Sequence, residues 1–155
     1  MPIKSFRGSM STSAGPSAPV ERVALRTNNG KIGYRLKKLQ IILTDPFVAA
    51  TKLIFKIYSV PQTTTDGIVD FSDQTLLGVA TYHDQPVAED MAESKTIIFD
   101  NVVFNQDIYL TCHDEGLNQK SASYYFELES IKLGLNDNTV ATLKDIRNVS
   151  WVLTK

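Results

Sequence analysis

The stretch that decides the fold is IGYRLKKLQIIL, residues 32–43. Its apolar side chains alternate with polar ones, first on even-numbered and then on odd-numbered positions. The even set is Ile32, Tyr34 and Leu36, and the odd set is Leu39, Ile41 and Leu43. A period of two is typical of a strand with one buried face. The change of parity at Lys37-Lys38 indicates either a β-bulge within one strand or two separate short strands.

A second alternating run precedes this stretch. In residues 23–27 (VALRT), Val23 and Leu25 alternate with polar or small side chains. Residues 28–30 (NNG) lie between the two runs, and Asn-Gly is a strong hairpin signal because both residues tolerate a positive φ. The sequence therefore predicts a β-hairpin with its turn at residues 28–30.

Strand-like runs continue along the rest of the chain. The further strand candidates are residues 51–60, 74–82, 95–104, 107–113, 122–133 and 149–153. A second change of parity predicts another bulge near Glu129-Ser130, and residues 139–147 suit either a short helix or a strand. About eight short strands without a long helical period are typical of sandwiches and barrels. The predicted fold is all-β: a single antiparallel β-sandwich, jelly-roll-like, with an extended N-terminal arm.

Alternation also assigns side chains to faces. In residues 51–60 it predicts an inward set, Leu53, Phe55 and Ile57, and an opposite set, Lys52, Lys56 and Tyr58. Cys112 has the same parity as Ile108 and Leu110, which predicts a small buried side chain rather than a nucleophile.

Composition limits the classes of function. A chain of 155 residues fits one domain, and its single cysteine excludes an internal disulfide or a Cys-based zinc site. The balance of 16 Lys and Arg against 17 Asp and Glu argues against a nucleic-acid binder. Apolar runs fall far short of the ~20 residues that span a bilayer, and no secretory signal is visible. We expect a protein used in a cytoplasm or in a particle assembled there.

The N-terminal residues differ in composition from the rest. Residues 1–19 are rich in Ser, Ala, Gly and Pro, and a segment of this kind buries too little apolar surface to fold alone. The sequence therefore predicts an extended low-complexity arm, 1–19, and a β-sandwich domain, 20–155. If the arm binds a neighbouring subunit, its large side chains Phe6, Arg7 and Met10 are the expected anchors.

Few residues suggest chemistry. No Gly-rich phosphate loop, HExxH, CxxC or G-x-S-x-G motif occurs in the sequence. His83 and His113, each followed by an aspartate, suit either a functional pair or ordinary strand-end histidines. The loop acids suit either a calcium site or solvated carboxylates; they are Asp66, Asp70, Asp73, Asp84, Glu89 and Asp90. We expect no enzyme activity, no cofactor and no metal.

A basic series follows the predicted hairpin. It consists of Arg22, Arg26, Lys31, Arg35, Lys37 and Lys38. These side chains suit either a solvated outer face or an electrostatic footprint for an acidic partner surface. The motifs and aromatic pattern of single-strand binders are missing, so we do not expect nucleic acid as the partner.

Several segments resemble small structural proteins of marine tailed bacteriophages. They are residues 105–110 (NQDIYL), 124–129 (YYFELE) and 138–148 (NTVATLKDIRN), together with 28–30 (NNG) and 56–58 (KIY). The resemblance covers most of residues 20–148, and it implies a virion component rather than an enzyme. We therefore expect a capsid decoration or cement protein that forms a small homo-oligomer and binds the major capsid protein or other virion proteins through its sandwich surface and arm.

Two alternatives remain for the place and partner of such a protein. It could be a tail, connector or fibre component instead of a head protein. A carbohydrate- or receptor-binding β-sandwich is the rival from another class, and it would use aromatic side chains such as Tyr58, Tyr82 and Trp151 beside the loop acids.

Overall fold

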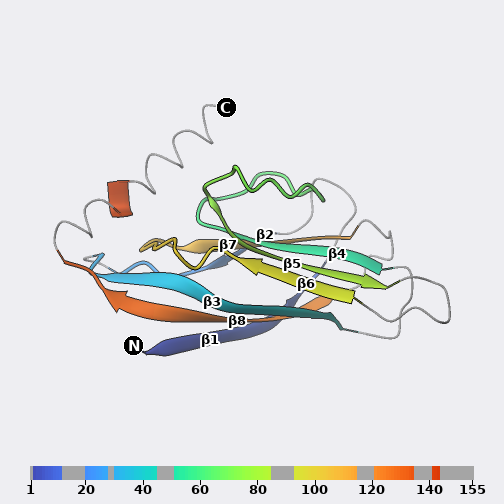
Figure 1. Ribbon diagram of the computed structural model, residues 1–155, viewed down its shortest axis with the longest axis horizontal. Helices are drawn as coiled ribbons and strands as arrows, with labels where there is room; N and C mark the ends of the chain where they lie inside the picture. Colours follow the sequence, from blue (N-terminus) through green and yellow to red (C-terminus); the bar gives the residue numbers. More distant parts are fainter. Residues whose placement is uncertain are drawn as a thin grey trace.

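The chain forms a sandwich of two antiparallel β-sheets (Figure 1). This computed structural model describes residues 2–11, 20–27, 30–44, 51–84, 93–114, 121–134 and 141–143. Its named strands are β1 (Ile3–Met10), β2 (Val20–Val23), β3 (Ile32–Leu43), β4 (Thr51–Tyr58), β5 (Leu76–Asp84), β6 (Glu93–Ile98), β7 (Ile108–Asp114) and β8 (Ala122–Lys132). The predicted all-β sandwich is confirmed. No helix among the described residues is long and apolar enough to cross a membrane.

The strands pair in a nested order. One sheet has three strands in the order β1-β8-β3, and the other has five in the order β2-β7-β4-β5-β6. The pairs β1–β8 and β2–β7 join early strands to late ones, and the consecutive strands β4 and β5 form the innermost pair, as in a jelly roll. The strand β6 pairs with β5, and a single bridge between Tyr34 and Phe104 connects the segment after β6 to β3.

The bulge predicted in residues 32–43 is confirmed. The pairing of β3 with β8 shifts register between Leu36 and Lys38, and Leu36 and Leu39 are both buried. The second predicted bulge is wrong, because β8 keeps one register through Glu129 and Ser130. Ser130 stays on the inward side, where its N–H and its hydroxyl both donate to the Pro2 carbonyl at 3.0 Å.

The predicted hairpin at residues 28–30 is also wrong in its pairing. Gly30 has a φ of 63° and donates to the Thr27 carbonyl at 3.3 Å. However, β2 lies in the five-stranded sheet and β3 in the three-stranded sheet, so the two strands do not pair. β2 ends at Val23, and the Asp107 carboxylate then binds the N–H groups of Leu25 and Arg26, which would otherwise be free to continue a strand.

The predicted N-terminal arm is partly a strand of the sandwich. Ile3–Met10 forms β1 and pairs with β8 over eight residues, so the division between arm and body does not hold there. The Phe6 ring stacks on Phe126 at 5.0 Å between centroids, and Met10 is buried. Gly8 is required by close approach, because a Cβ there would lie 2.8 Å from the Tyr124 hydroxyl oxygen. Residues 12–19 and 149–153 lie outside the described residues.

The core lies between the two sheets. The predicted inward residues Leu53, Phe55 and Ile57 are fully buried, and so is Cys112. At Gly78 the sheets approach so closely that a Cβ would lie 2.6 Å from a methyl carbon of Leu36. Two outer faces remain, and each positions a different set of polar side chains.

Candidate functional site

The predicted anchors of the arm lie within the sandwich. Phe6 and Met10 face inward and pack against the core, which gives both side chains partners in their own chain. Arg7 is exposed on the outer face of the three-stranded sheet, in register with Tyr125. Of the three predicted anchors, Arg7 is therefore the one whose side chain is available to another molecule.

The predicted basic series is not one patch. Arg22 and Arg26 lie beside Asp107 at the start of β7, whereas Arg35 pairs with Glu129 at 3.4 Å on the three-stranded sheet. The two residues of the bulge, Lys37 and Lys38, are exposed. Lys31, which precedes β3, is exposed as well. The hairpin expected to unite these residues does not form, so the series is split between the two sheets.

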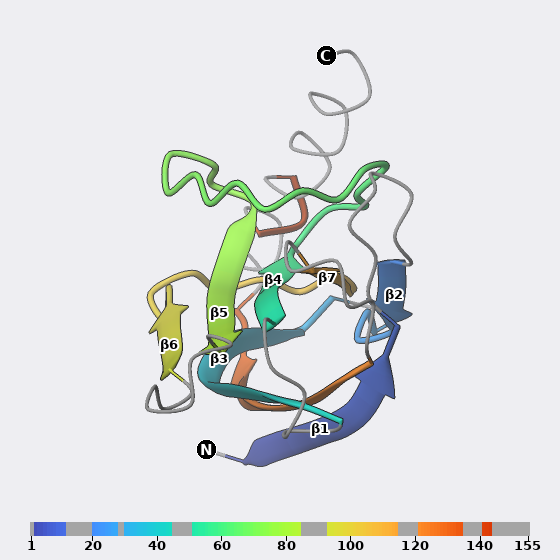
Figure 2. The same ribbon diagram turned by 90° about the vertical axis from the view of Figure 1, so that its right-hand side faces the viewer.

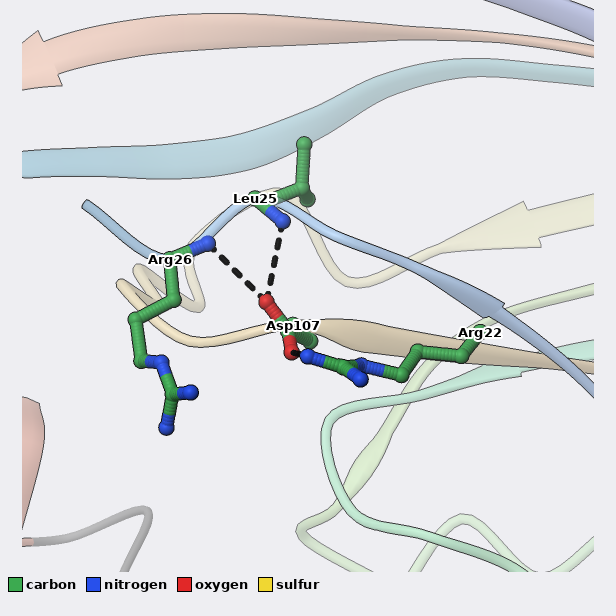
Figure 3. A network of polar contacts seen from close by, with 4 residues as sticks. All are labelled: Arg22, Leu25, Arg26 and Asp107. Atoms are coloured by element: carbon green, nitrogen blue, oxygen red, sulfur yellow. Dashed lines mark hydrogen bonds and ion pairs between the residues drawn. The ribbon is translucent and has the colours of Figure 1, made fainter.

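Asp107 is the centre of a polar network that ends β2 (Figure 3). Its Oδ1 accepts from the backbone N–H groups of Leu25 and Arg26, each at 2.9 Å, and its Oδ2 accepts from the Arg22 guanidinium at 2.7 Å. Burial alone would raise the pKa of this carboxyl, but these three donors outweigh burial and lower the pKa below its ordinary value. The Arg26 guanidinium points away from Asp107 (Figure 3). The network is structural: it fixes the point where the chain leaves the five-stranded sheet.

The outer face of the five-stranded sheet is covered by residues 59–75, here named the covering loop. Figures 1 and 2 show this loop, in green, on the side of β4 and β5 away from the three-stranded sheet. Ser59 and Thr75 close its base through a backbone hydrogen bond of 2.9 Å. The loop buries Lys56 and Tyr58. The alternation in the sequence predicts that both lie on this outer face, but it does not predict the loop that covers them.

Lys56 fastens the covering loop to the sheet. Its side chain is 3% exposed, and its Nζ donates to Asp66 Oδ1 at 3.0 Å and to the Ile68 carbonyl at 2.8 Å. The ammonium also lies 5.6 Å from the centroid of the Tyr58 ring. Burial acts to raise the pKa of Asp66, but Lys56 and the Ile68 N–H together lower it. Burial also raises the pKa of Tyr58, against the opposing effect of Lys56.

A polar pocket of 220 Å³ lies between the covering loop and the sheet. Its lining residues are Lys56, Tyr58, Gln62, Thr64, Thr65, Asp66, Ile68, Asp70, Asp73 and Thr111. Three of the predicted loop acids line it together, and each also organises its own turn. Asp70 Oδ1 binds the N–H and hydroxyl of Ser72, and Asp73 Oδ1 binds those of Thr75. The pocket therefore has a preformed wall.

The other predicted chemical groups are not brought into one site. His83 and His113 lie on β5 and β7, which are separated by β4. Within the described ranges, no group of three or more His, Cys, Asp or Glu is placed to hold a metal ion. Burial raises the pKa of the Cys112 thiol to about 12. Glu89 and Asp90, and the side chain of Asp84, lie outside what the structure describes.

The aromatic side chains of the carbohydrate-binding alternative are not exposed as expected. Tyr58 and Tyr82 are buried, and Trp151 lies outside the described residues. Tyr58 nevertheless lines the polar pocket beneath the covering loop.

The outer face of the three-stranded sheet is uncovered by described residues and carries charges of both signs. Register places Arg7 and Lys38 on either side of β8, whose outward residues include Tyr125, Glu127 and Glu129. The Tyr125 hydroxyl donates to Glu127 Oε1 at 2.5 Å, which raises the pKa of this tyrosine. Figure 2 shows this sheet on the opposite side of the sandwich from the covering loop.

No protein-family model matches the chain, and no curated protein matches its sequence. The structure itself offers two surfaces for binding: the charged outer face of the three-stranded sheet, and the pocket beneath the covering loop.

Proposed function

We propose that the protein is a non-enzymatic structural component of a phage virion that decorates the head by binding the major capsid protein. The observation that carries this proposal is the nested pairing of β1 with β8, β2 with β7 and β4 with β5. Viral capsid domains are among the proteins that use such jelly rolls. The resemblance of residues 105–110 and 124–129 to phage structural proteins supports the same class.

The outer face of the three-stranded sheet is the proposed contact with the capsid. Exposed Ile3 and Ile42 lie at opposite ends of this face, as the register of β1 and β3 with β8 shows. The charged rows of Arg7, Lys38 and Glu127 lie between them. Interleaved charges of both signs favour one orientation of a partner and avoid the repulsion that a single-signed face would create between neighbouring copies.

The test is in vitro decoration of purified particles that lack the protein. Copies bound per particle are counted by quantitative mass spectrometry as the protein is titrated. We expect saturation at a fixed copy number on the head, and a clear loss of occupancy in the double variant R7E/K38E. The matched control is K95E, since Lys95 is an exposed residue of β6 on the other sheet.

Other outcomes would overturn the decoration role. Binding only to tails would favour a tail, connector or fibre component, and no saturable binding to any part of the particle would exclude a virion role. The proposal also includes a small homo-oligomer, which light scattering on the purified protein measures directly; a monomer at all concentrations would contradict it.

A further inference from the structure

We infer that the pocket beneath the covering loop binds a neutral, hydroxyl-rich ligand of the size of one sugar ring. The covering loop, which lines the pocket, lies on the opposite side of the sandwich from the three-stranded sheet (Figure 2), so this site does not depend on the decoration role. It is built entirely from described residues of β4, β7 and the covering loop.

The sheet side of the pocket supplies hydrogen-bond donors. The Lys56 ammonium is directed at Asp66, at the Ile68 carbonyl and at the Tyr58 hydroxyl, so its three donors hold the pocket wall in place. Thr111 lies directly opposite Lys56 in the pairing of β4 with β7. Thr111 is 1% exposed and lines the pocket, yet its Oγ1 has no hydrogen-bond partner in the described structure. A buried hydroxyl without a partner is costly, and a ligand oxygen placed in the pocket would remove this cost.

The loop side of the pocket supplies hydrogen-bond acceptors. Asp66 and Asp73 each use Oδ1 to organise the covering loop, Asp66 with Ile68 and Lys56, and Asp73 with Thr75. The second oxygen, Oδ2, of each carboxylate makes no hydrogen bond to the described residues. Both of these aspartates line the pocket.

This arrangement selects the chemistry of the ligand. Three carboxylates and one ammonium line the pocket, which disfavours an anion such as phosphate. Lys56 already places a cation against Asp66 in this pocket, which disfavours a purely cationic ligand beside it. Hydroxyl groups both donate and accept, so a neutral polyol satisfies both walls. The 220 Å³ corresponds to about seven waters at ~30 Å³ each, which is room for one ring.

Titration of the full chain with free monosaccharides tests the inference. The probes are glucose, galactose, mannose and N-acetylglucosamine, followed by saturation-transfer NMR and calorimetry. We expect saturable binding of at least one sugar, and a Kd about tenfold higher in T111V, which removes the hydroxyl and keeps the shape of the side chain. The thermal midpoint of T111V should not fall, because no described residue uses this hydroxyl.

Two further variants keep the test decisive. The matched control is T81V: Thr81 lies on the same outer face, on β5, but does not line the pocket, so its Kd should equal that of the wild type. D73N retains the Oδ1 acceptor of the turn and should also weaken sugar binding. The inference is overturned if no sugar binds saturably, if T111V and T81V bind alike, or if inorganic phosphate or free arginine binds there in preference to sugars.

Discussion

At the scale of single residues, the pair formed by Lys56 and Asp66 has unequal members. Lys56 is almost fully buried, whereas the Asp66 side chain is 57% exposed. Removing Asp66 leaves a buried ammonium with fewer partners, while removing the charge of Lys56 leaves a carboxylate that water can solvate. We predict that D66A lowers the free energy of unfolding by about 2 kcal/mol and that K56M lowers it by less than about 1 kcal/mol. Urea denaturation of both variants measures this, and a larger loss in K56M would contradict it.

Asp107 links stability to acid pH. Its pKa in the folded protein lies below its ordinary value of 3.8. A carboxyl with a lowered folded pKa adds stability above its unfolded pKa, and this stability is lost as the pH falls through the folded pKa. We predict that D107N lowers the free energy of unfolding by about 1 kcal/mol at pH 7, because the buried acceptor of the Leu25 and Arg26 N–H groups loses its charge.

The stability of D107N should also depend less on pH than that of the wild type. As the pH falls below 4, the wild type loses the contribution of Asp107, whereas D107N has nothing to lose at this position. The free energies of unfolding of the wild type and of D107N, measured from pH 7 to pH 2, should therefore converge. Asp66, whose pKa is also lowered, accounts for part of the remaining slope. A constant difference in the free energy of unfolding between the two proteins over this pH range would contradict the lowered pKa of Asp107.

The sequence predicts the inward residues better than the pocket residues. The parity of Phe55 and Cys112 assigns them to the core, because side chains on one face of a strand share the environment of that face. The same parity assigns Lys56 and Thr111 to the opposite face, but it contains no information on what covers that face. The covering loop comes from a separate segment, so the pocket depends on tertiary packing that alternation does not encode.

At the scale of elements, the bulge in β3 sets which side chains enter the core. The extra residue lets Leu36 and Leu39 both face inward, although their positions differ in parity. Deleting Lys37 would remove the extra residue, and every later side chain of β3 would then change face if the pairing of Leu36 were kept. We predict that this deletion abolishes cooperative thermal unfolding monitored by circular dichroism.

The substitution K37A is the control for that deletion. It removes the exposed side chain and keeps the residue count, so we expect a change of less than about 0.5 kcal/mol. An equal loss of stability in the deletion and in K37A would show that the side chain of Lys37, rather than the bulge, stabilises the fold.

The strand partners were harder to predict than the strands. Residues 28–30 indicate that the chain turns, and Gly30 does have a positive φ. A turn signal does not tell whether the flanking strands hydrogen-bond to each other. Asp107, which binds the N–H groups of Leu25 and Arg26 after β2, is distant in the sequence. β1 was missed because Ser5, Gly8 and Ser9 are small or polar, although Gly8 is small for a reason that only the packing against Tyr124 reveals.

At the scale of the whole molecule, the nested order makes the two ends of the described sandwich depend on each other. Among the described strands, β1 pairs only with β8, and Ile3 lies in register with Glu129. The number and spacing of strands predicted the sandwich, but neighbours in a nested sheet come from distant parts of the chain. Contacts of this kind form late and slowly in folding, since long loops must close first.

The last prediction concerns removal of residues 1–11 and distinguishes a strand from a mobile arm. The deletion takes Phe6 and Met10 from the core and exposes the backbone edge of β8. We therefore predict a loss of about 4 kcal/mol, a fall in the thermal midpoint of about 10 °C. A mobile arm would leave the midpoint unchanged. The control is complementation: a synthetic peptide of residues 1–11 should raise the midpoint of the truncated protein by adding back the missing strand, whereas a peptide with Phe6 and Met10 replaced by Ser should not.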